Sequence, residues 1–212
     1  MKDLIRKGAD GLETEISEEQ ISDFITFYDE INKWGKKINL TALLNNKEKL
    51  VEELFLDSMA PLKIMEGTGN EDITLLDIGS GGGFPGIPIK IINRSIIVTL
   101  SDSIEKKVFF MRNVIRALSL DKTVAANVKY GEAGAPGLNK LFFDFAVSKA
   151  VATADKLGIW AAPHLKKNGR LICMKSEGEA LIRLNGYREP ESFPYTLPLS
   201  GIKRKLIVYV KE

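Results

Sequence analysis

Apolar positions in the first third of the chain repeat with the spacing of an α-helix. Ser17 followed by Gln20 forms a capping-box pattern, which predicts a helix start, and Gly35 predicts its end. Between them one helical face carries Ile21, Phe24, Ile25, Tyr28, Ile31 and Trp34. A second stripe after Asn46 holds Leu50, Val51, Leu54, Phe55 and Met59. Residues 1–70 are therefore expected to form a helical extension that ends in a loop over Gly67, Gly69 and Asn70.

From residue 73 onward, short apolar runs alternate with amphipathic stretches. The runs predict strands over 73–78, 96–100, 124–128, 142–147, 169–174 and 206–210. Helices are expected between them, one with Pro88 in its first turn, one over 105–118 and one over 154–165. Such alternation favours an α/β fold whose mostly parallel sheet is covered on both faces. We expect 71–212 to be one compact domain.

Composition narrows the chemistry. The 212 residues carry a net charge of only +2, so any nucleic-acid binding must use a local basic patch. One cysteine and one histidine exclude a disulfide within the chain and nearly exclude zinc sites and Cys–His or Ser–His catalysis. Cys173 lies in an apolar run and is expected in the core, and His164 is expected at a helix end. We predict no catalytic acid or base and no metal ligands.

Targeting signals are not evident in the sequence. Residues 1–10 are charged and lack the apolar segment of a signal peptide. No uninterrupted apolar run approaches the roughly 20 residues that span a bilayer. These features, with the single cysteine, predict a cytoplasmic protein without membrane contact.

A glycine-rich loop after the strand over 73–78 is the strongest local signal for a ligand. It contains Gly79, Ser80, Gly81 and Gly83. Glycine allows positive φ angles and lets a ligand approach the backbone closely. In open α/β sheets ligands bind beyond the carboxyl ends of the strands, so these four residues are predicted to bind a cofactor.

The spacing of the glycines bears on which cofactor binds. The dinucleotide pattern G-x-G-x-x-G would require a third glycine where Phe84 stands, whereas the chain has G-x-G-x-G. That spacing suits a ligand without a pyrophosphate and favours S-adenosylmethionine over NAD. Asp102, at the end of the next strand, is placed to accept hydrogen bonds from ribose hydroxyls. Because an acid occurs there in both ligand classes, Asp102 leaves both cofactors open.

Several further motifs resemble one known family. The chain is similar to the small-subunit ribosomal RNA guanine-N7 methyltransferases, also called glucose-inhibited division protein B, from about residue 20 to the end. The Gly-Phe-Pro-Gly-Ile-Pro segment is the most specific match. The matching segments are Asn39 to Ala42, Leu56 to Ser58, Asp77 to Pro88, Asp102 to Phe110, Ser148 to Ala152, Lys167 to Gly169 and Lys203 to Val210.

The resemblance implies a Rossmann-like class I methyltransferase fold, with a seven-stranded sheet whose last strand is antiparallel. It implies S-adenosylmethionine as methyl donor and a guanine N7 of 16S ribosomal RNA as acceptor. Its cofactor contacts carry over to Gly79 and Phe84, to Ala133 and Gly134 in a second region, and to Lys149 in a third.

The chain departs from the family pattern at three places. Leu54 stands where the family usually has histidine, and Glu132 and Gly134 replace an arginine and an acid. Lys149 replaces an arginine, and lysine lacks the fork of donors that arginine offers.

Guanine N7 carries a lone pair and no proton, so its methylation requires alignment rather than a general base. The resemblance places the segment with Lys36, Asn39 and Thr41 near the acceptor, and these are the predicted substrate-binding residues. The expected partner is 16S ribosomal RNA or the small ribosomal subunit, bound by a monomer. Three alternatives stay open: a methyltransferase of the same fold with another acceptor, an NAD-binding oxidoreductase, and a non-catalytic RNA-binding relative.

Overall fold

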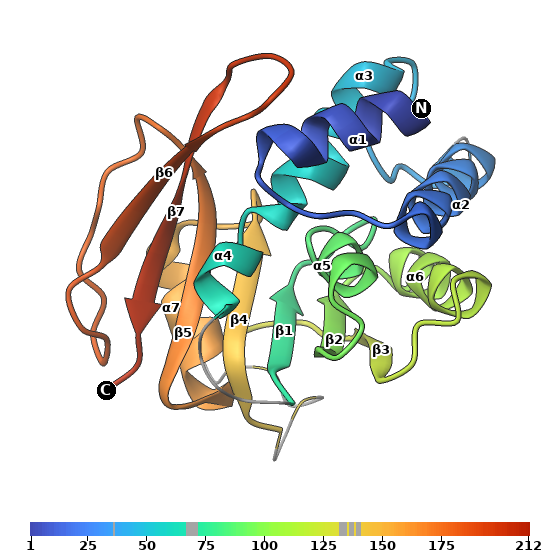
Figure 1. Cartoon of the computed structure of the whole chain (residues 1–212). Helices are drawn as coiled ribbons and strands as arrows, with labels where there is room; N and C mark the ends of the chain where they lie inside the picture. Colours follow the sequence, from blue (N-terminus) through green and yellow to red (C-terminus); the bar gives the residue numbers. More distant parts are fainter. Residues whose placement is uncertain (36, 67–71, 132–134, 136–137, 139–140) are drawn as a thin grey trace.

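The computed structural model describes residues 1–212 apart from 36, 67–71, 132–134, 136–137 and 139–140 (Figure 1). Within the described residues, seven strands form one sheet in the order β3-β2-β1-β4-β5-β7-β6. In chain order they are β1 (Thr74–Ile78), β2 (Ile97–Asp102), β3 (Thr123–Asn127), β4 (Phe143–Lys149), β5 (Leu165–Ser176), β6 (Glu191–Thr196) and β7 (Lys203–Val210). The fold is thus the Rossmann-like class I methyltransferase architecture that the resemblance implied.

Strand direction divides the sheet into two parts. Strands β1 to β5 are parallel wherever they are neighbours, and β7 lies antiparallel between β5 and β6. The antiparallel last strand is therefore confirmed. The apolar pattern alone did not predict β6, because its side chains are mostly exposed and Pro194 interrupts it. Proline is tolerated there because β6 is an edge strand.

Two layers of helices cover the sheet. Helices α5 (Gly86–Ile92) and α6 (Glu105–Ala117) pack on one face, and α7 (Ala154–Ala161) packs on the other. A short 3₁₀ turn, η4 (Ala162–His164), follows α7. Adjacent residues of β1 serve opposite faces, since Leu75 belongs to the core under α5 and α6 and Leu76 to the core under α7. Both strand faces are buried, which explains why apolar residues stand at successive positions of β1 rather than at alternate ones.

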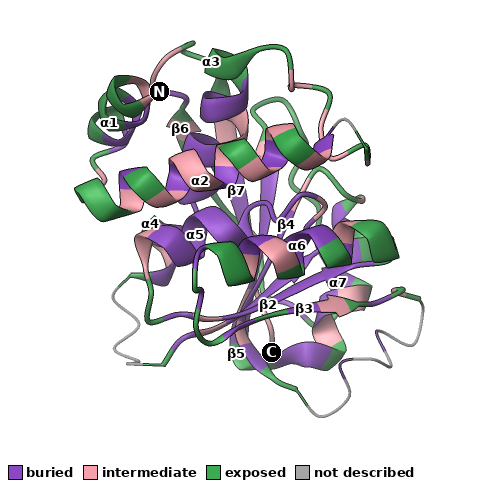
Figure 2. Ribbon diagram, turned by 90° about the vertical axis from the view of Figure 1, so that its right-hand side faces the viewer, coloured by how far each residue is buried: buried purple, intermediate pink, exposed green. Residues whose placement is uncertain are grey.

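The N-terminal helices form a further layer. They are α1 (Lys2–Gly11), α2 (Glu18–Gly35) and α3 (Lys47–Leu50), and α2 lies across α5 and α6 (Figure 2). The predicted capping box is present: Gln20 N donates to Ser17 Oγ at 3.1 Å, and Ser17 N donates to Gln20 Oε1 at 2.8 Å. The buried face of α2 belongs to the same core as the sheet. The sequence did not predict α1, whose buried stripe is short, with Ile5, Gly8 and Ala9.

The second predicted helix changes its winding partway. After α3 the chain continues as a π-helical segment, η1 (Val51–Leu56), then as a 3₁₀ turn, η2 (Asp57–Met59), and then as α4 (Leu62–Met65). Short π segments inside helices recur at functional sites. This one brings Glu53 and Leu54 to the carboxyl edge of the sheet, and Asp57 follows them there at the start of η2.

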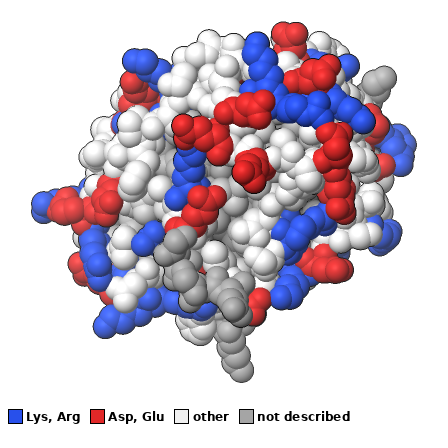
Figure 3. All heavy atoms as spheres, in the orientation of Figure 1, with Lys and Arg blue, Asp and Glu red and all other residues white. Residues whose placement is uncertain are grey.

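The surface carries both charge signs in small clusters on the face shown in Figure 3. None of the helices that the structure describes combines the length and the apolar composition needed to cross a bilayer. The predicted loop over Gly67, Gly69 and Asn70 lies outside the described residues.

Candidate cofactor site

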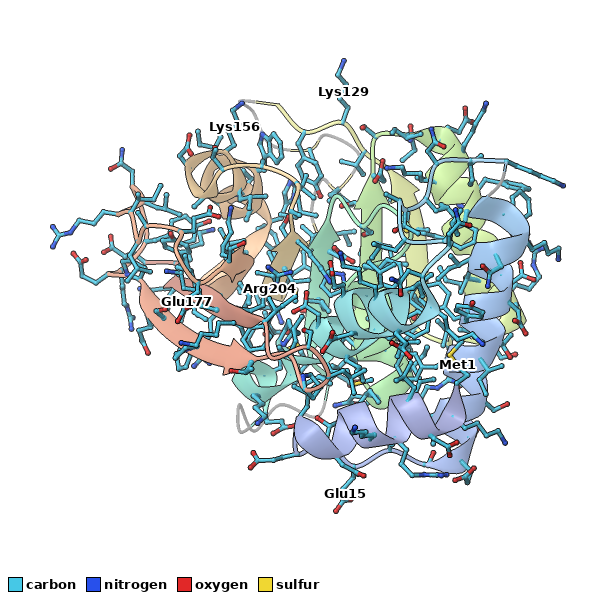
Figure 4. The ribbon with its side chains drawn as sticks, turned by 90° about the horizontal axis from the view of Figure 1, so that it is seen from above. Met1, Glu15, Lys129, Lys156, Glu177 and Arg204 are labelled. Carbon is cyan, nitrogen blue, oxygen red and sulfur yellow. The ribbon has the colours of Figure 1, made fainter. Side chains whose placement is uncertain are left out.

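A cavity of about 560 Å³ lies at the carboxyl edge of the parallel strands, the edge seen from above in Figure 4. Its walls come from the last residues of β1, β2 and β4 and from the segments that follow β1, β2, β3 and β4. One residue each comes from α6, α7, η1 and the 37–46 segment. The lining residues are Leu40, Leu54, Ile78–Gly82, Phe84, Asp102–Ile104, Lys107, Val128–Tyr130, Lys149–Val151 and Trp160. The cavity is therefore where the fold predicts a ligand.

The glycine loop shapes the floor of this cavity. Gly79 has a φ of +73°, and a Cβ added to it would lie 2.6 Å from Val151 Cγ2. Gly81 has a φ of +58°, and an added Cβ would have no neighbour nearer than 4.0 Å. The first glycine thus permits close packing between two strand ends, and the second leaves backbone open toward the cavity.

Asp102 holds the glycine loop against the end of β2. Its Oδ2 accepts from Gly81 N at 2.9 Å, and its Oδ1 accepts from Ile104 N at 2.8 Å. The side chain is buried yet lines the cavity. Each carboxylate oxygen has a second lone pair, so the geometry leaves acceptor capacity for ligand hydroxyls.

Asp77 lies beneath the loop and is fully buried. Its Oδ2 accepts from Gly86 N at 2.8 Å, whereas Oδ1 has no hydrogen-bond partner among the described residues. Desolvation raises the pKa of this carboxyl to about 7. The nearby Asp102 adds to the rise, and Lys149 opposes it.

Aromatic and apolar side chains form another wall of the cavity. Tyr130 and Trp160 stack with ring centroids 5.4 Å apart, and the half-exposed Ile104 lines the cavity with them. Tyr130 Oη lies 2.7 Å from Ser101 Oγ, which itself donates to Asp77 O. Apolar and aromatic surfaces of this kind suit the planar adenine of a nucleoside, while Asp102 suits its ribose.

Lys149 closes the cavity on the β4 side. Its ammonium pairs with Asp57 Oδ2 at 2.7 Å and also donates to Glu53 O in the π-helical segment. Tyr195 Oη donates to the other oxygen of Asp57 at 2.6 Å. Burial, together with the negative charge of Asp57, raises the pKa of the Tyr195 hydroxyl far above the usual range. This cluster joins β4, β6 and the N-terminal segment at one point.

The structure brings most of the predicted cofactor residues together. Gly79, Ser80, Gly81, Phe84, Asp102 and Lys149 all line the cavity. Gly83 is not among the lining residues and instead packs on Ile87. Ala133 and Gly134, like Glu132, lie outside the described residues.

Of the predicted substrate-binding residues, Asn39 is exposed and the Thr41 hydroxyl accepts from Leu43 N at 3.1 Å. Leu40 between them lines the cavity, so the two residues flank its wall. Lys36 lies outside the described residues.

Sequence reasoning did not find several lining residues. Ile104 follows Asp102 by two positions, so the end of β2 could have indicated it. Tyr130 and Trp160 carry no motif, because folding alone brings together residues 30 positions apart.

Cys173 and His164 have no part in the site. Cys173 is buried in β5, and His164 ends η4, where its Nε2 accepts from Ala135 N at 3.2 Å.

Solved structures show the same fold at low sequence identity. A mutant of MtNAS in complex with S-adenosylmethionine has a TM-score of 0.58 at 16% identity, covering 90% of this chain and 73% of that one. The ribosomal protein L11 methylase from Lactobacillus delbrueckii subsp. bulgaricus has a TM-score of 0.51 at 14% identity, covering 76% of this chain and 79% of that one. At these identities the likeness establishes the fold alone.

Sequence comparison is more specific. Residues 20–188 match the GidB family model, described as rRNA small subunit methyltransferase G. The ribosomal RNA small subunit methyltransferase G of Geotalea uraniireducens is 37% identical over 99% of this chain and 96% of its own length. The protein of the same name from Geobacter sp. strain M21 is 34% identical over 98% of this chain and 96% of its own length. The expected family is confirmed: the chain belongs to the rRNA small subunit methyltransferase G family, a family of S-adenosylmethionine-dependent methyltransferases.

Proposed function

We propose that this enzyme transfers the methyl group of S-adenosylmethionine to N7 of a guanine in 16S ribosomal RNA. The observation that carries the proposal is the glycine-loop cavity between Gly81, Asp102 and Tyr130, in a chain whose relatives are named for small-subunit rRNA methylation. The cofactor supplies an electrophilic methyl group on a sulfonium. The protein supplies alignment, because N7 has no proton to remove.

The residues present fit this cofactor. Asp102 offers hydrogen-bond acceptors to the ribose of the cofactor, and Ile104 and Tyr130 offer apolar surface to its adenine. The open backbone at Gly81 lets the cofactor approach the glycine loop closely. We propose Gly79, Ser80, Phe84 and Lys149 as further cofactor residues, with Lys149 acting from the wall. Its pairing with Asp57 offsets a positive charge that would otherwise repel the sulfonium.

We propose that the acceptor enters past the 37–46 segment, with Asn39 and Thr41 in contact with RNA. An Asn39→Ala variant should keep its affinity for S-adenosylmethionine and lose methyl transfer. Full transfer by this variant would remove Asn39 from the substrate site. We further propose that the protein is cytoplasmic, since ribosomal RNA is its substrate. We also propose that it is a monomer, which sedimentation would test directly.

Calorimetric titration with S-adenosylmethionine and, separately, with NADH tests the cofactor first. Binding of the former alone supports the proposal, and binding of NADH alone would favour an oxidoreductase. Mass mapping of 7-methylguanosine in a 16S fragment then tests the acceptor. Cofactor binding without any methylated guanine, in the fragment or in isolated small subunits, would refute the proposed acceptor.

A further inference from the structure

A second cavity of about 290 Å³ adjoins the cofactor cavity at the ends of β4 and β5. The two cavities share Leu54, Lys149 and Ala150 in their walls. The walls that belong to the second cavity alone come from η1, η2, β5, β6 and β7, with Glu53, Asp57, Met174–Ser176, Tyr195 and Arg204. Methyl transfer requires the acceptor atom to lie directly beside the donor, and this cavity adjoins the one proposed for the donor.

Resting on the proposed function, we propose that this second cavity, the acceptor cavity, holds the target guanine and that Glu53 recognises its Watson–Crick edge. The reaction forms an N7–CH₃ bond and breaks the S–CH₃ bond, whose electron pair returns to sulfur. No proton moves. N7 must therefore present a free lone pair toward the shared wall of Leu54 and Lys149, and no donor of the protein should occupy that lone pair.

Guanine with N7 left free must be held by its other edge. That edge carries the N1–H and N2–H donors, which a carboxylate accepts best as a pair. Asp57 cannot serve, because its two oxygens accept from Tyr195 at 2.6 Å and pair with Lys149 at 2.7 Å. Among the described residues, the carboxylate of Glu53 has one ion-pair partner, Lys49 Nζ at 3.7 Å, and its side chain is 23% exposed. It is the carboxylate on the cavity wall with acceptor capacity to spare.

The charge of the cavity suits the product of the reaction. Guanine gains one positive charge when N7 is methylated, and the donor loses one. The carboxylate of Glu53 lies in the wall of the cavity where that charge arrives, so it favours the transfer. The ammonium of Lys149 would oppose it, but the Asp57 pair offsets that charge.

The guanidinium of Arg204 lies in the wall of the cavity. Arg204 is the second residue of β7 and lies inward of the β6–β7 hairpin in Figure 4, whereas Lys129 projects outward from the far side. Within the described part of the chain its guanidinium donates one long hydrogen bond, from Nη1 to Ser176 Oγ at 3.5 Å. Lys175 beside it is already paired with Glu179 at 2.5 Å. Arg204 is thus placed to contact the phosphate of the acceptor nucleotide.

The test uses two synthetic 16S fragments, with guanosine or inosine at the acceptor position. Inosine lacks the N2 amino group but keeps N7. The intact enzyme should prefer guanosine by about tenfold or more in kcat/KM. With inosine, the carboxylate that accepts from the N2 amino group loses its hydrogen-bond donor. Glu53→Gln should lower kcat/KM for guanosine by about tenfold and largely abolish the preference. Glu48→Gln, an exposed acid one turn earlier, is the matched control and should change neither.

Binding measurements separate this role from loss of the cofactor site. Calorimetry should give Glu53→Gln and Arg204→Ala the affinity of the intact enzyme for S-adenosylmethionine, within about twofold. Arg204→Ala should weaken RNA binding. It should also lower the slope of the logarithm of the RNA-binding constant against the logarithm of salt concentration by about one, the value for one lost phosphate contact. Arg183→Ala, at an exposed arginine of the loop before β6, should do neither.

The outcomes keep the two proposals apart. One outcome is that the intact enzyme methylates guanosine while Glu53→Gln keeps both the methylation rate and the preference for guanosine over inosine. In that case the assignment of the acceptor cavity and Glu53 to guanine recognition is wrong, while the proposed function stands. Equal loss of cofactor affinity in Glu53→Gln would also overturn the assignment, because Glu53 would then belong to the cofactor site. If the intact enzyme makes no 7-methylguanosine in either fragment or in isolated small subunits, the proposed function itself fails.

Discussion

The cofactor cavity and the acceptor cavity are built in opposite ways. The cofactor cavity depends on short stretches of chain, where Gly79 and Gly81 follow β1 and Asp102 ends β2. The acceptor cavity depends on the Lys149, Asp57 and Tyr195 cluster, whose members come from three distant parts of the chain. A local motif can be recognised in a sequence, whereas a cluster of this kind becomes visible only when the fold assembles it.

The largest expected effect is at the cluster. Lys149→Met should destabilise the protein by about 3–5 kcal/mol, because it leaves the buried carboxylate of Asp57 without its cation. The two side chains are only 16% and 4% exposed. Urea unfolding would measure the loss.

An exposed ion pair provides the control. Lys122 pairs with Asp72 at 2.9 Å, with side chains 56% and 65% exposed. Lys122→Met should cost about 0–1 kcal/mol, because solvent screens such pairs. If Lys149→Met and Lys122→Met cost the same, the cluster does not hold the acceptor side together.

The sequence predicted the two sides unequally for this reason. Strand β1 and the glycine loop were predicted because an apolar run and a turn motif lie next to each other. Strand β6 was missed because exposed side chains and Pro194 conceal it. Tyr195 lies on that strand, so the cluster that it joins could not be predicted either. Lys149 was predicted through resemblance, but its pairing with Asp57, 92 positions earlier in the chain, was not.

The next effect concerns the floor of the cofactor cavity. Burial raises the pKa of Asp77 to about 7, so the folded protein keeps a proton there that the unfolded chain releases near pH 4. The contribution of Asp77 to the free energy of unfolding should therefore fall as pH rises from about 4 to about 7. Between about pH 5 and pH 8 the Asp77 contribution should drop by about 3 kcal/mol, at 1.36 kcal/mol per unit.

Asp77→Asn isolates that contribution from other titrating groups. Asparagine keeps a carbonyl oxygen for Gly86 N and cannot ionise. The difference in unfolding free energy between the intact protein and Asp77→Asn should change with pH from about pH 4 to pH 7 and stay constant at higher pH. A difference that stays constant from about pH 5 to pH 8 would contradict the raised pKa.

A smaller effect is expected in the glycine loop. Gly79→Ala should weaken S-adenosylmethionine binding by about tenfold to a hundredfold, about 1.4–2.7 kcal/mol. Its Cβ would press on Val151 from a backbone with positive φ, so the loop must move. Calorimetry would measure the affinity. Gly178→Ala is the control, since an added Cβ there meets nothing within 4 Å, and it should bind the cofactor normally.

The smallest effect is the most local one, and it tests how far short-range prediction extends. Ser17 caps α2 through the bond from Gln20 N at 3.1 Å, a contact that the sequence predicted from spacing alone. Ser17→Ala should cost about 1 kcal/mol in urea unfolding, because the Gln20 N–H loses its partner. Ser22→Ala, on the exposed face of the same helix, should be neutral or slightly stabilising because alanine favours helix. If Ser17→Ala is also neutral, the helix start depends on the packing of α2 over α5 and α6 rather than on its cap. Even this element would then owe its stability to distant contacts, as the acceptor cavity does.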